Sequence, residues 1–137
     1  MPAARFQTLL NHCLGLLSGC HTRVTLFAVE VPGGSPTEVE ATIVEALAPL
    51  GGVGRLPDSR IGLVYLGPRG NEDGANALDA YVSERISRRL LDRGWGRYIP
   101  LVRIANVDRW TDTIREAHDL IDALPARGTG FVRFRRA

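Results

Sequence analysis

The side chains best suited to metal binding or nucleophilic catalysis are few in this chain. They are three histidines and two cysteines, at His12, His21, His118, Cys13 and Cys20. The histidines fall on a predicted helix, a loop and another predicted helix, and none has a second ligand at the spacing of a metal site. The cysteines are also not at metal spacing. We therefore expect surface histidines, one core thiol, one loop thiol and no metal.

Nucleophilic catalysis also lacks its usual residues. His118 stands beside Asp119, but adjacent helical residues point in different directions, and no serine occupies a nucleophile elbow. All seventeen basic residues are arginine, so no lysine is available for a Schiff base or a Walker A phosphate site. The formal net charge of +2 is too small to demand nucleic acid as a partner. The sequence thus predicts no cofactor.

One segment offers an alternative function. The sequence RGTGFVRF at 127–134 matches the RNP1 pattern of RNA-binding domains except at Thr129, where an aromatic residue is expected. RNP1 lies on a third strand that is followed by a helix and a further strand, whereas only three residues follow here. The context does not favour the match, although Phe131 and Phe134 could still stack on single-stranded bases.

Membrane attachment has one weak signal. Leu17-Ser18-Gly19-Cys20 spells the box that precedes the acylated cysteine of bacterial lipoproteins. The residues before it are interrupted by polar side chains, so they lack the unbroken apolar segment of a signal peptide. No apolar run is long enough to cross a bilayer. We therefore expect a cytoplasmic protein.

Hydrophobic periodicity predicts four helices and up to five strands. Apolar residues recur at helical spacing in segments that begin at Phe6, Val39, Leu78 and Trp110. Strands are expected at 24–31, on both sides of a hairpin turn within 52–67, at 98–107 and, as a short last strand, at 131–134. The chain of 137 residues is long enough for one domain with its own core.

The order of these elements predicts a ferredoxin-like βαββαβ core. The runs 24–31 and 61–66 are apolar on both faces, which places them in the middle of a sheet, and Pro100 places the strand 98–107 at an edge. A ferredoxin-like sheet has its first and third strands in the centre and its fourth at an edge. We expect an α/β (α+β) fold with a mostly antiparallel sheet flanked by helices. The single domain spans 1–137, with a first helix at 1–19 and a core at 23–134.

Several local signals refine this prediction. Ser35 is expected to cap the second helix, with Pro36 in its first turn and Glu38 bonding back to the cap. Pro57 fits the second position of a tight turn, and Asp73 is expected to cap the third helix. The third helix also carries four arginines that predict a solvated face rather than a binding patch: Arg85, Arg88, Arg89 and Arg93.

The residues Arg55-Leu56 before the hairpin turn, the strand Ile61–Leu66 after it and the pattern of the last predicted helix resemble a GGDEF domain, the diguanylate cyclase family, and the resemblance extends over nearly the whole chain. Arg55-Leu56 stands before the hairpin turn as an arginine and an aromatic or aliphatic residue stand before the signature of that family. The strand Ile61–Leu66 resembles the strand that follows the signature. The last predicted helix resembles the family's last helix in its pattern of Ala117, Leu120, Ile121, Ala123 and Gly128, with one extra residue.

The resemblance implies that the metal site of the family is degenerate here. Activity in this family implies two metal ions, held by acids at the end of the first strand and in the hairpin turn. Glu30 matches the first position and keeps a carboxylate. The signature is matched by Pro57-Asp58-Ser59-Arg60-Ile61, so that Arg60 falls on the metal-binding acid, and a guanidinium cannot ligate magnesium.

The nucleotide and product sites implied by the resemblance are also changed. Pro57 and Asp58 add side chains where the family has two glycines, and a register shifted by one residue restores Asp58 alone. The connection from the first strand into the second helix is shorter than in active members, so the family's asparagine and aspartate for guanine and phosphate have no counterparts. The product-binding arginine and aspartate fall on Ala48 and Gly51.

We therefore expect a catalytically inactive GGDEF-like domain that acts as a regulatory or protein-interaction domain in bacterial signalling. Its partner would be another protein or an upstream sensor domain, and the first helix could pair with a second copy. Two alternatives remain: an active or nucleotide-binding cyclase with rearranged ligands, and a ferredoxin-like module for a small ligand or RNA. We also expect Glu30 and Arg60 to form an ion pair in place of the metal.

Overall fold

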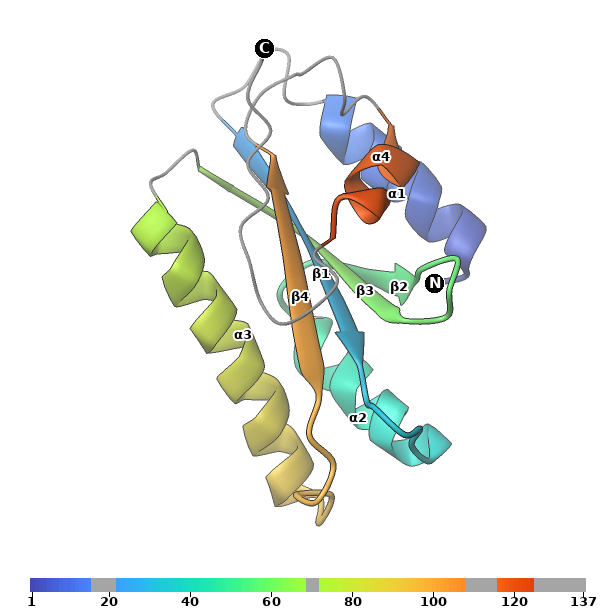
Figure 1. Cartoon of the computed structure of the whole chain (residues 1–137), viewed down its shortest axis with the longest axis vertical. Helices are drawn as coiled ribbons and strands as arrows, with labels where there is room; N and C mark the ends of the chain where they lie inside the picture. The colour runs from blue at the N-terminus through green and yellow to red at the C-terminus, as the bar shows by residue number, and fades with distance from the viewer. Residues whose placement is uncertain (16–21, 69–71, 108–115, 125–137) are drawn as a thin grey trace.

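The computed structural model describes residues 1–15, 22–68, 72–107 and 116–124. Its centre is a four-stranded antiparallel sheet with the strand order β2-β3-β1-β4 (Figure 1). The elements in chain order are α1 (Ala3–Gly15), β1 (Thr22–Glu30), α2 (Thr37–Leu47), β2 (Gly52–Arg55), β3 (Ile61–Pro68), α3 (Glu72–Asp92), β4 (Leu101–Val107) and α4 (Ala117–Asp122). The predicted fold class, the central positions of β1 and β3 and the edge position of β4 are confirmed.

The helices cover both faces of the sheet, so the domain has three layers. The helices α1 and α4 lie on one face, and α2 and α3 lie on the other (Figure 1). Along β1, Leu26 and Ala28 point toward α1 and α4, whereas Phe27 and Val29 point toward α2 and α3. Side chains alternate between the two faces of a strand, so a strand with both sets apolar can only be central.

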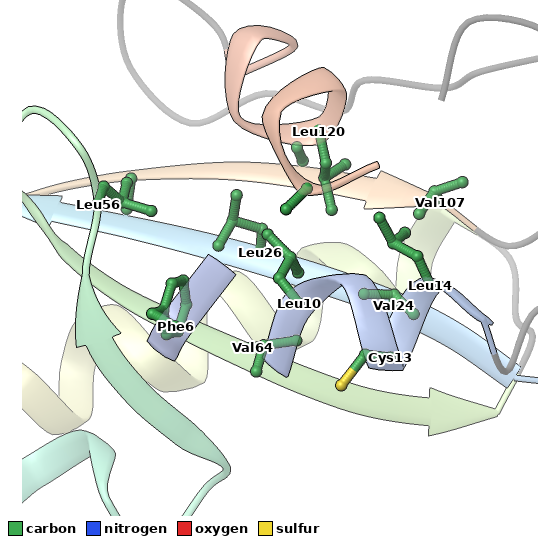
Figure 2. Close-up of a cluster of buried hydrophobic side chains, with 13 residues drawn as sticks. Phe6, Leu10, Cys13, Leu14, Val24, Leu26, Leu56, Val64, Val107 and Leu120 are labelled. Carbon is green, nitrogen blue, oxygen red and sulfur yellow. The ribbon is translucent and has the colours of Figure 1, made fainter. Parts of the chain in front are cut away.

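Helix α1 is seated in a notch made by two glycines. Gly54 of β2 faces Gly62 of β3 in the register of the sheet. The ring of Phe6 fills the space above them, so close that a Cβ built on Gly54 or on Gly62 would lie 2.7 Å or 2.8 Å from its carbon atoms. The same helix buries Leu10 and Leu14 in this core (Figure 2). The two glycines therefore allow α1 to approach the sheet directly.

This docking bears on the expected pairing of two copies through the first helix. The apolar stripe of α1 is buried against the sheet of its own chain. The outward residues of α1 include Arg5, Thr8 and His12, which are exposed and polar. A homodimer through α1 would have to use this polar face while the helix stays docked. The predicted dimer therefore remains a prediction.

Helix α4 is shorter than the predicted last helix and is tied to α1. The backbone N–H of Ala117 donates a hydrogen bond to Asn11 Oδ1 at 2.6 Å, so a side chain of α1 satisfies the first turn of α4. Ala117 and Leu120 are buried there, while Ile121 and Leu124 are partly buried. Trp110, where the predicted last helix begins, lies outside the described residues.

Two predicted helix caps are wrong. The N-cap of α2 is Pro36, with φ −60° and ψ 155°, and no side chain caps it. Ser35 is one residue too early, because the carbonyl of Pro36 already accepts the N–H of Val39 at 3.0 Å. Helix α3 begins at Glu72, so Asp73 lies within the helix and not before it.

Three arginines of α3 link this helix to α2, whereas the sequence predicts only a solvated face. Arg88 is exposed and pairs with Glu84 of its own helix at 2.6 Å. Arg89 and Arg93 instead reach Glu45 on α2, at 3.4 Å and 2.8 Å. The Nε–H of Arg85 donates to the carbonyl oxygen of Ala46 at 2.6 Å. This face is therefore partly solvated and partly a link between α2 and α3.

Several predictions fall outside the described residues. They concern the end of the first helix at Gly19, Cys20, His21 and the segment 127–134 with its expected last strand. None of the described helices combines the length and the apolar character needed to cross a bilayer.

Candidate functional site

The β2–β3 hairpin ends in a tight turn at residues 56–60. The N–H of Ser59 donates to the carbonyl of Leu56, and the N–H of Leu56 donates to the carbonyl of Arg60, both at 2.9 Å. Pro57 occupies the second position of this turn, as predicted. Ser59 has φ +76°, the left-handed conformation that closes hairpins of this length. Leu56 is 1% exposed and anchors the turn in the core, so Asp58 and Arg60 project from a fixed backbone.

The register of the sheet brings the site residues to one end. Val29 pairs with Ile61 at the end of the β1–β3 ladder, so Glu30 and Arg60 are the next facing positions. On the other side of β1, Glu30 pairs with Leu101 at the start of β4. The carboxylate at the end of the first strand and the arginine of the turn therefore meet at the same edge, as the resemblance implied.

The expected ion pair between Glu30 and Arg60 does not form. Arg60 Nε lies 2.7 Å from Asp58 Oδ2, within the same turn. Glu30 Oε1 lies 2.8 Å from Arg103 Nη1 on β4. Arg103 is a diagonal neighbour of Glu30 across β1 and β4, and long side chains reach each other at such positions. Each expected partner is thus occupied by a closer group of opposite charge.

A third ion pair lies beside the first two. Arg55 Nη2 is 2.5 Å from Glu40 Oε2 on α2, and Arg55 Nη1 donates to the carbonyl oxygen of Ser59 at 3.0 Å. The N–H of Arg55 donates to the carbonyl of Met1 at 2.9 Å, which ties the start of the chain to β2. Arg55 therefore connects the hairpin turn with α2 and with the N-terminus.

Two adjoining hollows open around these charges, and we call them together the hairpin groove. The hollow on the α2 side has a volume of about 350 Å³, and the hollow on the α4 side has a volume of about 430 Å³. Both are lined by Glu30, Asp58 and Arg60. The α2 side adds Glu40 and Arg55, and the α4 side adds the side chains of Arg103, Ile121, Asp122 and Leu124.

The other sequence-predicted site residues lie apart from this groove or on its margin. Ala48 is the C-cap of α2, where its N–H donates to the carbonyl of Val44 at 2.9 Å. Gly51 packs so tightly that a Cβ there would lie 2.2 Å from the carbonyl oxygen of Val64. Ile61 is 3% exposed and belongs to the core shared with α2 and α3, and together with Ser59 it lines the hollow on the α2 side. Pro57 shapes the turn but does not line either hollow.

The described residues contain no cluster of three or more histidine, cysteine, aspartate or glutamate side chains that could hold a metal ion. In the groove, Glu30, Glu40 and Asp58 each bind an arginine. His118 lies 3.3 Å from Glu116 and 3.2 Å from Asp119, on an exposed part of α4. Cys13 is buried in the core below α1, as predicted, and burial raises the pKa of its thiol.

Sequence reasoning missed Arg103 and Glu40 as members of this site. Both belong to elements that were predicted correctly, and both lie far along the chain from their partners. The alternation of side chains along β4 is the one signal that could have placed Arg103 in the site. It puts this residue on the same sheet face as Glu30. Nothing in the sequence identifies Glu40 as the partner of Arg55.

Comparisons with known proteins agree with this architecture. No protein-family model and no curated protein matches the sequence. Among solved structures, the chain is similar to an N-terminally truncated form of TpbB, also called YfiN, from Pseudomonas aeruginosa, which comprises only the GGDEF domain. The two superpose with a TM-score of 0.60 over 96% of this chain and 88% of that chain, at 15% sequence identity.

The chain has the fold of a GGDEF domain. The predicted fold resemblance is confirmed over almost the full length. At 15% identity the comparison establishes the fold alone and assigns no activity to the groove. What the hairpin groove can do depends on its own side chains.

Proposed function

We propose that this chain is a GGDEF-fold domain that does not synthesise cyclic di-GMP, and that it acts as a regulatory or protein-interaction domain in bacterial signalling linked to that messenger. The observation that carries the proposal is the pairing of charges in the hairpin groove. Glu30, Glu40 and Asp58 are bound by Arg103, Arg55 and Arg60 respectively.

This pairing works against divalent cations. A two-metal site on a triphosphate needs carboxylate oxygens that are free to coordinate both ions. In the groove those oxygens accept hydrogen bonds from guanidinium groups, and each guanidinium adds a positive charge that repels a cation. Arg60 also stands where the resemblance expects a metal-binding acid. The groove therefore favours internal ion pairs over metal binding.

The short connection between β1 and α2 also disfavours turnover of GTP. The backbone passes from the end of β1 at Glu30 to the start of α2 at Thr37 through six residues, 31–36. The resemblance places guanine-binding and phosphate-binding residues in a longer connection, and this chain has no room for them. Pro57 and Asp58 also occupy the positions where the family has glycines.

An apolar margin beside the groove supports a role in protein interaction. Leu101 at the start of β4 and Ile99 two residues before it are 37% and 74% exposed. Leu101 pairs with Glu30 in the sheet register, so the exposed apolar side chains begin where the groove ends. Exposed aliphatic side chains next to paired charges are typical of surfaces that bind proteins.

The enzymatic part of the proposal is tested by incubating the full chain with GTP and Mg²⁺ or Mn²⁺, followed by mass spectrometry of the products. An active diguanylate cyclase under the same conditions is the positive control. We expect no cyclic dinucleotide. Any cyclic di-GMP above the level of a no-protein blank would contradict the proposal and would favour the alternative of a cyclase with rearranged ligands. Calorimetry with GTP and with cyclic di-GMP then shows whether a nucleotide still binds without turnover.

The interaction part is tested by placing a photo-crosslinking amino acid at position 99 in cells that express the protein. Position 88, on the exposed face of α3, is the matched control. We expect a defined crosslinked protein from position 99 and not from position 88. The same products from both positions, or none from position 99, would argue against a docking surface at this margin.

A further inference from the structure

A second group of polar side chains lies at the opposite end of β1, on the sheet face that packs against α2 and α3. It consists of Arg23 and Thr25 on β1 and Asn106 on β4. These side chains belong to residues that are only 8%, 1% and 8% exposed, respectively. Thr25 pairs with Asn106 in the sheet register, and its hydroxyl donates a hydrogen bond to Asn106 Oδ1 at 2.5 Å.

The register also brings Arg23 close to Asn106. Arg23 precedes Thr25 by two residues, so both side chains leave the same face of β1. Asn106 is therefore a diagonal neighbour of Arg23, within reach of a long side chain. On the other side of β1, the residue opposite Arg23 is Gly67, and the ring of Tyr65 lies over this glycine, 2.9 Å from where a Cβ would stand.

Two buried donors of this group lack a partner. Neither Arg23 Nε nor Asn106 Nδ2 has a hydrogen-bond acceptor among the protein atoms, and both atoms are shielded from solvent. The ion pairs among the described residues do not include Arg23. A buried N–H donor without an acceptor is unfavourable, so native structures rarely retain one unless something else satisfies it.

We propose that Arg23 and Asn106 bind an oxyanion, the carboxylate or phosphate group of a small ligand, at this face of the sheet. Both free atoms are donors, so the ligand must supply acceptor oxygens. The positive charge of Arg23 favours an anionic acceptor, because charge-assisted hydrogen bonds are stronger than hydrogen bonds between neutral groups.

This site is separate from the hairpin groove. Arg23 stands near the start of β1 and Glu30 at its end, a distance of roughly 23 Å at about 3.3 Å per residue. The two sites share no residue. The proposal therefore holds or fails independently of the function proposed for the groove.

The test measures binding of oxyanions to the full chain by calorimetry and by thermal unfolding. Inorganic phosphate and acetate or citrate are added at millimolar concentration, with sodium chloride keeping the ionic strength constant. We expect one class to bind and, at ten times its Kd, to raise Tm by about 5 °C. The phosphate and carboxylate arms distinguish the two sources of the oxyanion. If neither class binds at millimolar concentration, the proposal is wrong.

Two variants assign the binding to this site. Asn106→Asp keeps the shape of the side chain but places a carboxylate beside Arg23, so we expect at least a tenfold loss of affinity for the oxyanion. Arg23→Met removes the charge and should cause the same loss. Arg88→Met, at an exposed arginine of α3, is the matched control and should bind as the unchanged protein does.

The two variants also guard against a simple folding defect. If Arg23→Met does not fold, Asn106→Asp carries the test, because it differs from the native side chain by one atom. In addition, the side-chain Nδ2 protons of Asn106 should shift in NMR spectra of the unchanged protein when the oxyanion is added. Binding that persists in a folded variant, or that leaves these signals unmoved, would place the oxyanion elsewhere and overturn the proposal.

Discussion

Arg60 and Asp58 form an ion pair within the hairpin turn, with Nε and Oδ2 2.7 Å apart. The N–H of Arg60 also donates to Asp58 Oδ1 at 3.1 Å, so both carboxylate oxygens of Asp58 are used by one residue. A cation that entered the hairpin groove would have to displace this arginine. This pairing is the physical basis of the proposal that the hairpin turn does not bind a metal ion.

Reversing the charge at position 60 should create a weak cation site. Arg60→Glu removes the guanidinium, frees Asp58 and adds a second carboxylate opposite Glu30. We expect calorimetry to detect Mn²⁺ binding at millimolar concentration in this variant and none in the unchanged protein. The variant should still make no cyclic dinucleotide, because the short connection between β1 and α2 is unchanged.

Arg88→Glu is the control for the charge change at Arg60. It alters the net charge by the same amount on an exposed face of α3, away from the hairpin groove. Equal Mn²⁺ binding by the two variants would mean that bulk charge and not the geometry of the turn attracts the ion.

The notch under α1 should not tolerate a methyl group. In Gly62→Ala the new Cβ would lie 2.8 Å from the ring of Phe6, so α1 must shift or the ring must leave its place. We expect the free energy of unfolding in urea to fall by about 1–3 kcal/mol. Gly15→Ala, where a Cβ meets nothing within 4 Å, should not lower the free energy of unfolding.

A second substitution tests whether Phe6 causes that loss. Phe6→Leu removes the ring atoms that approach Gly62, so in its presence Gly62→Ala should be less destabilising than in the native background. A double-mutant cycle measures this coupling. Strict additivity of the two changes would show that the notch is not formed as described.

The fold was largely predictable because it follows from local patterns that agree with one another. Strands β1 and β3 are apolar on both faces, Pro100 stands beside the edge strand, and Gly54 and Gly62 fall in the two arms of the hairpin. The cap of α2 was not predictable from Ser35, because Pro36 and Ser35 offer competing starts one residue apart. Tertiary context decided between them.

The candidate site was predictable in its location but not in its pairings. The strand register brings Glu30 and Arg60 to one edge, and the pattern of the strands already contains that information. The choice of partner depends on Arg103, which reaches Glu30 from a strand that follows much later in the chain. The sequence pattern predicts which side chains share a face of a strand. It does not predict which of several arginines lies nearest to Glu30.

The left-handed residue of the turn should store a small amount of strain. Ser59 has φ +76°, a conformation that glycine adopts without a steric penalty. We expect Ser59→Gly to raise the free energy of unfolding by about 0.5–1 kcal/mol in urea titrations, after the entropy of the unfolded chain has offset part of the gain. Ser59→Ala keeps the strain and should not stabilise the protein, so stabilisation by both variants would contradict this explanation.

The buried thiol of Cys13 should make stability fall at alkaline pH. Burial raises the pKa of Cys13 above the ordinary value of 9.0, because the folded protein disfavours the thiolate. Below pH 9 the thiol is neutral in both states and its contribution is fully present. As the pH rises above 9, the unfolded state loses the proton first, and the free energy of unfolding decreases. The difference in this free energy between the unchanged protein and Cys13→Val should therefore shift against the unchanged protein from pH 8 to pH 10. A difference that is constant over this range would show that the thiol ionises as readily in the folded core as in the unfolded chain.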